Sequence, residues 1–221
     1  MTSSTVANLG QKIETYERTR RKGVDFLLSN LHDDGSLNDI HRPRVTYYRL
    51  PWALQLAGET AAAFRALDWI AANALGDDGR FHGGVAWDSP ANAISNTYAE
   101  TCLAYGAVLL RRLDISRKAM EFAKLFQDPS NGGVFMTREQ TGLDAPQQLF
   151  LTCQFGMSAV MTGDLMSATA VGEWLDRLWS AQPELPARLY TVTTPRQGLV
   201  TRVPGGADAR HYINVSQEVR Q

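Results

Sequence analysis

The sequence predicts an all-α fold made of stacked helical hairpins, and three observations lead to this fold class. A phrase with a small residue, an aromatic residue three positions later, a short apolar run and a Gly-containing turn recurs along the 221-residue chain. Helices that are apolar nearly all round alternate with helices that carry charge on one face. The length suits one domain with a sizeable core. Together these features predict two concentric layers of helices around a central space.

The repeated phrase occurs in three clear copies and one degenerate copy. The copies cover residues 23–37, 66–81, 119–135 and 171–183. The first two contain Asp-Asp-Gly turns, at Asp33-Asp34-Gly35 and Asp77-Asp78-Gly79. Aspartate suits such turns because its side chain bonds nearby backbone amides, so we interpret these carboxylates as turn residues.

Helical periodicity and turn signals divide the chain into elements. The expected helices cover residues 5–31, 47–57, 59–75, 96–113, 116–126, 149–162 and 165–181. Beyond residue 183 the helical pattern is lost, and we expect an irregular C-terminal segment with short strands at 190–192 and 199–201. No linker is evident, so residues 1–221 are treated as a single domain.

Charge, cysteine usage and apolar runs limit the partners and the cellular location that we expect for this chain. The chain has 22 Lys and Arg against 23 Asp and Glu, and no basic tract, which argues against a nucleic-acid surface. Cys102 and Cys153 lie far apart in apolar stretches, as reduced thiols do. The N-terminus has no apolar leader, and no apolar run approaches the roughly 20 residues that span a bilayer. We therefore expect a cytoplasmic protein with no membrane span that acts on a small molecule.

The repeated phrase resembles the QW repeat of squalene–hopene and oxidosqualene cyclases, and related repeats of protein prenyltransferase β subunits. The resemblance rests on the run 22–37, on Gln127 at the glutamine position of the third copy, and on Phe81 and Phe135 at the tryptophan positions of the second and third. It implies an α/α toroid of the terpene cyclase and prenyltransferase superfamily, in which inner helices surround an apolar cavity.

The chain departs from the chemistry of those enzymes. The Asp-x-Asp-Asp motif with which terpene cyclases protonate their substrates is absent. The zinc site of the prenyltransferases places Asp and Cys two positions apart, whereas Asp144 and Cys153 are nine apart. We therefore expect no metal and no cofactor. The helices also fall short of the closed ring that the resemblance implies, which leaves an open ring, a ring completed by a partner chain such as a homo-oligomer, or a sequence that stops early.

The loop before the first inner helix is rich in groups that bind ligands. Its candidate substrate-binding residues are Asp39, His41, Arg44, Tyr47, Tyr48 and Arg49. At a cavity mouth, Arg and His would bind a carboxylate or phosphate, and tyrosine rings would stabilise a cation. Trp52 and Tyr98 extend the expected pocket wall. The alternative is a solvated loop with two core tyrosines.

Glu100 is the first candidate for proton transfer, because the helix around it is otherwise nearly uncharged. A buried carboxylate is costly unless it is paired or protonated, and a protonated one suits a general acid. The alternative is a partnered structural glutamate. Cys102 and Cys153 are further catalytic candidates. They lie at similar distances beyond repeat glycines, so we expect both thiols at similar depth, either facing one cavity or packed in the core.

Two loops at matching ends of the hairpins supply the remaining candidates. His82, Trp87 and Asp88 precede the Glu100 helix, and Asp144 and Gln147 precede the next inner helix. Such loops converge on one rim. We expect His82 and Asp88 as acid–base groups, and Trp87, Asp144 and Gln147 as substrate contacts.

The first functional interpretation is an enzyme with lyase, isomerase or cyclase chemistry on a small, largely apolar substrate, isoprenoids being among the candidates. It predicts that Glu100→Gln leaves the fold intact and abolishes turnover. The second is a carbohydrate-active α/α-barrel enzyme, an epimerase, hydrolase or lyase, with aromatic side chains stacked on sugar rings. The third is a non-catalytic helical-repeat module that binds a partner on an open concave face.

Overall fold

Helices dominate the computed structural model, which describes residues 3–38, 46–82, 97–201 and 212–214. Its helices are α1 (Ser3–Ser29), α3 (Leu50–Leu56), α4 (Thr60–Asn73), α5 (Tyr98–Leu109), α6 (Leu113–Lys124), α7 (Leu149–Thr162) and α8 (Leu165–Ser180). All seven helices expected from the sequence are present, with shifts of a few residues at their ends.

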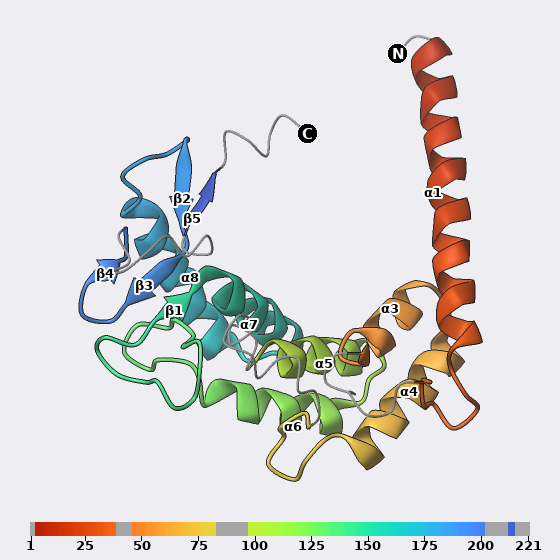
Figure 1. Ribbon diagram of the computed structural model, residues 1–221, viewed down its shortest axis with the longest axis horizontal. Coiled ribbons are helices and arrows are strands. Elements are labelled where there is room, and N and C mark those ends of the chain that lie inside the picture. Colours follow the sequence, from red (N-terminus) through yellow and green to blue (C-terminus); the bar gives the residue numbers. More distant parts are fainter. Residues whose placement is uncertain (1–2, 39–45, 83–96, 202–211, 215–221) are drawn as a thin grey trace.

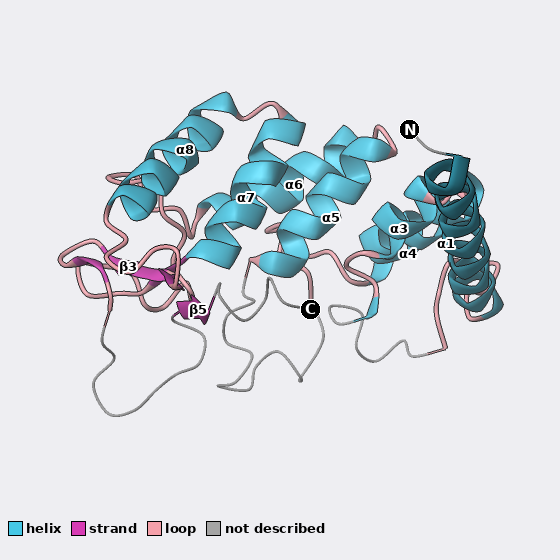
Figure 2. Cartoon of the chain, turned by 90° about the horizontal axis from the view of Figure 1, so that it is seen from above, coloured by secondary structure: helices cyan, strands magenta, loops and turns pink. Residues whose placement is uncertain are grey.

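The helices after α1 form two rows (Figures 1 and 2). The inner row is α3, α5 and α7, in which each helix packs against the next, and the outer row is α4, α6 and α8, each packed against the inner helix before it. The outer helix α6 also touches the following inner helix, α7. Within the described ranges the row is open, with α1 and α3 at one end and α8 at the other. The structure thus establishes a helical two-row arrangement, and the closed toroid goes beyond it.

The repeat turns share one backbone geometry. Each closes with an isolated antiparallel bridge, and the bridges pair Leu31 with Leu37, Leu75 with Phe81, and Gln127 with Val134. In the third turn the bridge partner is Val134, whereas the sequence analysis placed Phe135, the next residue, at this position of the repeat. In each turn an aspartate accepts the amide hydrogen of the second residue after it, and the three aspartates are Asp34, Asp78 and Asp128. The predicted role as turn residues is thus confirmed for Asp34 and Asp78, and Asp128 adds the same contact in the third turn.

A glycine in each turn lies directly on the backbone of the next outer helix. Gly35, Gly79 and Gly132 have φ of 88°, 85° and 81°. A Cβ atom at any of them would lie 2.0–2.1 Å from a backbone carbonyl oxygen. The three contacts are Gly35 to Arg65 in α4, Gly79 to Lys118 in α6, and Gly132 to Ala170 in α8. Only glycine permits this approach, which explains why it recurs in the phrase.

The glutamines of the later copies reinforce their turns. Gln127 donates from Nε2 to the Ser167 carbonyl of α8, at 3.2 Å. Gln182, in the degenerate copy, donates to the Tyr190 carbonyl at 2.9 Å and accepts the Tyr190 amide hydrogen at 2.8 Å. The side chain of Gln182 therefore performs the pairing that backbone bridges perform in the other turns.

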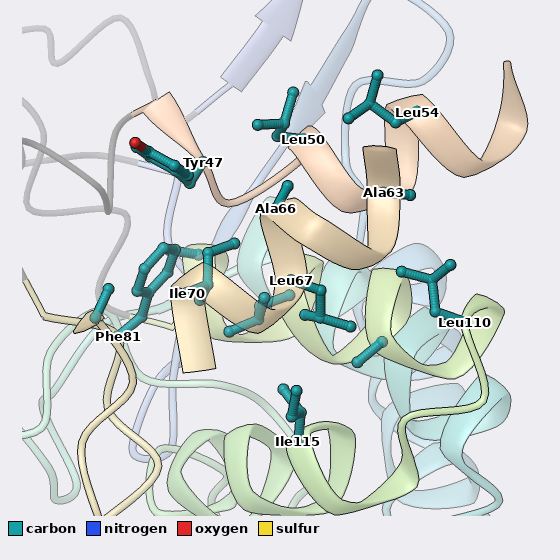
Figure 3. Packing of buried hydrophobic residues seen from close by; sticks show 14 of the residues in the cluster. Tyr47, Leu50, Leu54, Ala63, Ala66, Leu67, Ile70, Phe81, Leu110 and Ile115 are labelled. Carbon is teal, nitrogen blue, oxygen red and sulfur yellow. The ribbon is translucent and has the colours of Figure 1, made fainter. Parts of the chain in front are cut away.

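Two apolar clusters form the core. One joins α3, α4 and α5 and contains Leu50, Leu54, Leu67 and Ile70, which converge in Figure 3. The other joins α5, α6 and α7 and includes Phe155 from the middle of α7. Because α5 contributes to both clusters, nearly every residue along it is buried.

Short strands follow and interrupt the helices. A three-stranded antiparallel sheet has the order β1 (Gln147–Gln148), β3 (Val192–Thr194) and β4 (Gly198–Leu199). A second sheet pairs β2 (Arg188–Tyr190) with β5 (Tyr212–Asn214). The all-α prediction was therefore incomplete. The predicted C-terminal hairpin is present as β3 and β4, but its pairing with residues just before α7 was not foreseen.

Candidate functional site

An arginine surrounded by aromatic rings lies at the start of the inner row. The guanidinium carbon of Arg49 lies 5.1 Å from the ring centroid of Tyr98, 5.5 Å from that of Tyr48 and 6.0 Å from that of Trp52. Such distances favour attraction between the cation and the ring faces. The structure thus brings together four residues that the sequence proposed for substrate binding. We call this group, with Cys102, the Arg49 cluster.

The rings of the cluster continue along the inner row. Trp52 of α3 contacts Tyr105 of α5, with centroids 4.5 Å apart, and Tyr98 of α5 contacts Phe150 of α7, with centroids 4.7 Å apart. Tyr105 and Phe150 were missed. The signal that could have found them is the repeat itself, because Tyr105 follows Trp52 by 53 residues and Phe150 follows Tyr98 by 52. Aromatic rings at equivalent positions of successive inner helices therefore contact one another.

Cys102 is buried beneath Arg49. Burial raises the pKa of the Cys102 thiol to about 12, although the hydrogen bond and charge of Arg49 act in the opposite direction. The thiol is therefore protonated at neutral pH. A nucleophile needs the thiolate, so this environment suits packing better than covalent catalysis.

Two polar groups of the cluster have capacity for a further partner among the described residues. Arg49 is exposed, and no ion pair within the described ranges involves it. The indole nitrogen of Trp52 is buried and lacks a hydrogen-bond partner among the described residues. A buried donor without an acceptor is unfavourable, so a group that brings an oxygen to Trp52 would be stabilised there.

Glu100 has a structural partner. It is fully buried, and its Oε1 accepts the Phe81 amide hydrogen at 3.0 Å. The equivalent amides of the other turns also donate to a side chain near the start of the next inner helix, Leu37 to the Tyr47 hydroxyl and Val134 to Thr152 Oγ1 at 3.0 Å. Tyr47, Glu100 and Thr152 are spaced by 53 and 52 residues. The position of Glu100 therefore belongs to the repeat.

Gln147 is a buried polar hub. Its amide nitrogen donates to Asp128 at 3.0 Å and to Asn131 at 3.1 Å. Its carbonyl oxygen accepts from Trp174 Nε1 and from Thr193 Oγ1, both at 3.2 Å. These bonds join the third turn, α8 and β3, and they occupy the groups that a substrate would use. Tyr47 is likewise committed to the core, where its ring stacks on Trp69 at 4.6 Å.

The remaining candidates lie apart from the Arg49 cluster. Cys153 is exposed on α7, whereas Cys102 is buried, so the expectation that both thiols face one cavity at similar depth was wrong. Asp144 is exposed and pairs with Arg196 at 2.8 Å. His82 is exposed at the end of the second turn. Asp39, His41, Arg44, Trp87 and Asp88 lie outside the described residues.

Neither a metal site nor a membrane-spanning helix is found in the part of the chain that the structure describes. No three His, Cys, Asp or Glu side chains there lie close enough to hold a metal ion. None of these helices combines the length and the apolarity needed to cross a bilayer.

Comparison with known proteins gives no match: no protein-family model fits the chain, and no curated protein or solved structure is significantly similar to it. The resemblance to QW repeats therefore stands on the residues that carry it.

Proposed function

We propose that the inner face of the helix row binds a small, largely apolar molecule with an anionic end at the Arg49 cluster. The observation that carries this proposal is an exposed guanidinium set among three aromatic rings from the start of α3 and from α5. Arginine binds carboxylate and phosphate groups through paired hydrogen bonds. The half-buried rings of Tyr48 and Trp52 would contact the apolar part of the ligand, and Trp52 Nε1 would donate to one of its oxygens.

We also propose that the row closes over this face into an α/α toroid. A closed ring would place the Arg49 cluster on the wall of a central cavity, where exclusion of water strengthens the pairing of Arg49 with an anion. Lyase, isomerase or cyclase chemistry on the bound molecule is the reaction class that we propose for such a cavity. Glu100 is a weaker candidate for its proton transfer than the sequence suggests, since it already holds the Phe81 amide.

Calorimetric titration with farnesyl diphosphate, decanoate, farnesol and maltose tests the proposal. We expect the two anions to bind and to alter Trp52 fluorescence, and farnesol to bind more weakly. Arg49→Met should weaken anion binding at least about tenfold, the effect of losing a charged hydrogen bond. Arg117→Met provides the matched control, because Arg117 is also exposed but lies on the outer helix α6.

The same titration separates the alternatives. Binding of maltose, lost in Trp52→Ala and retained in Arg49→Met, would replace the proposal with the carbohydrate interpretation. Anion binding that Arg49→Met and Arg117→Met weaken equally would reflect general surface charge and would also contradict it.

A further inference from the structure

We infer that copies of this chain assemble head to tail, with α7 of one copy seated in a groove between α1 and α3 of the next. The two ends of the row carry the two halves of an interface that the row already contains twice, between α3 and α5 and between α5 and α7.

The first half of this interface is the open side of α7. The side of α5 around Thr101 is covered by α7, where Ser158 Oγ donates to the Thr101 carbonyl at 2.8 Å. On α7 the position equivalent to Thr101, 52 residues later, is Cys153. Cys153 is exposed, and it forms a helical stripe with Met157 and Val160, which are 38% and 59% exposed. Among the described inner helices, the last one therefore keeps open the side that its predecessors cover.

The second half is a groove at the other end of the row. It has a volume of about 560 Å³ and is lined mainly by apolar residues of α1 and of the end of α3, with one arginine at its edge. The lining residues are Arg20, Gly23, Val24, Phe26, Leu27, Ala53, Leu56 and Ala57. Leu56 and Phe26 are each 67% exposed. Such an exposed apolar groove is typical of an interaction surface.

The repeat identifies what fits this groove. Inside the chain, α3 packs against both α4 and α5, and α5 packs against both α6 and α7, so an inner helix sits between the next outer and inner helices. The helices α1 and α3 are the corresponding pair at the first position, and the seat of their inner helix is empty within the described ranges. The inner helix with an open side is α7, which already packs against its own outer helix α8, so its open side would meet α3 while α1 borders the contact.

The small residues that inner helices place at their contacts support this pairing. Gly106 of α5 lies against the backbone of Trp52 in α3, where an added Cβ would be 3.1 Å from its nitrogen. Ser158 holds the same position in α7, 52 residues later. Counting back 53 residues from Gly106 gives Ala53, which is small and exposed in the groove. A partner copy's α7 would thus meet Ala53 as α3 meets Gly106. Head-to-tail contacts of this kind form a ring where the rotation between copies closes and a filament where it does not.

Native mass spectrometry and light scattering of purified protein test the inference with matched pairs of variants. We expect a mass of at least two chains at micromolar concentration. Leu56→Glu and Met157→Glu should each give monomers, because a charge would enter an apolar contact. Leu165→Glu and Met166→Glu are the controls, with the same substitutions at α8 positions that are 67% and 84% exposed. All four positions are on the surface, so circular dichroism should remain unchanged.

A cross-link tests the orientation. In Ala53→Cys, a short bis-maleimide should join the new thiol to Cys153 of another copy and give dimers in a denaturing gel. Cys153→Ser in the same background should abolish them. Within one chain α5 lies between α3 and α7, which prevents an internal link. A monomeric wild type, or an assembly that persists in Met157→Glu or Leu56→Glu, would overturn the inference, and so would the absence of the cross-link.

Discussion

The helices α5 and α7 occupy equivalent places in successive repeats, yet only α5 is covered on all sides. The two share an apolar composition and the same turn contact, Phe81 to Glu100 in one and Val134 to Thr152 in the other. Around α5 lie α3, α6 and α7, whereas α7 lacks the next inner helix within the described ranges. A helix whose sequence is apolar nearly all round is suited to burial on every side. The open side of α7 therefore indicates a missing neighbour.

Substitution of a turn glycine should give the largest loss in the free energy of unfolding. In Gly79→Ala the new Cβ would lie 2.0 Å from the Lys118 carbonyl oxygen, so the second turn must separate from α6. We expect a loss of about 4 kcal/mol in the free energy of unfolding. Gly163→Ala at the end of α7 is the control, because its φ of 79° is similar but nothing lies within 4 Å. It should lose only about 1–2 kcal/mol. Equal losses in urea unfolding would show that backbone strain, and not the close contact, determines the cost.

Truncation within the two helices tests the comparison directly. Leu103→Ala in α5 removes a fully buried side chain and should lower the free energy of unfolding by about 3 kcal/mol. Val160→Ala on the open side of α7 should lower it by about 0.5 kcal/mol or less. Val108→Ala, at the equivalent position of α5, should fall between them. The measurements belong in a Leu56→Glu background, which keeps the α7 side open. A large loss for Val160→Ala in that background would mean that the chain itself covers α7.

Removal of the side-chain acceptors of the turn amides should give the next largest loss in the free energy of unfolding. Glu100→Ala leaves the buried Phe81 amide without this acceptor and should lower the free energy of unfolding by about 2 kcal/mol. Thr152→Val does the same to Val134 and should cost about 1–2 kcal/mol. Glu100→Gln keeps an oxygen acceptor, so it should remain within about 1 kcal/mol of the wild type. Denaturant unfolding provides the values, and a destabilised Glu100→Gln would mean that the charge of Glu100, and not its oxygen, holds the turn.

The sequence predicts the hairpins because local signals determine them. The glycine of each turn is required by contact with the next outer helix, and the aspartates bond their own turns, so both recur at fixed positions. The pairing of β1 with β3 was missed because it joins residues about 45 positions apart, as Gln147 and Thr193 show, and two-residue strands have no periodic pattern.

The candidate site was predicted in part for a related reason. Arg49, Tyr48 and Trp52 are close in sequence, and Tyr98 opens the next inner helix, so the hairpin arrangement brings them together. The prediction that the two cysteines lie at similar depth was wrong because it counted residues from the turn glycines across loops of different length. Counted from Glu100 and Thr152, Cys153 matches Thr101 and not Cys102. A shift of one residue turns a side chain by about 100° around a helix, which moves Cys153 from the core to the open side.

The two thiols extend the comparison to a smaller, pH-dependent effect. Folding raises the pKa of Cys102 from its ordinary 9.0 to about 12. Between these values the unfolded chain loses a proton that the folded chain keeps, so the free energy of unfolding falls as the pH rises. This contribution is complete below pH 9 and should decrease by about 1 kcal/mol at pH 10. Urea unfolding from pH 8 to pH 10 should therefore show a steeper decline in Cys153→Ser than in Cys153→Ser combined with Cys102→Ala. Other titrating groups are common to both proteins and cancel, so parallel declines would mean that the Cys102 thiol is reached by solvent in the folded chain.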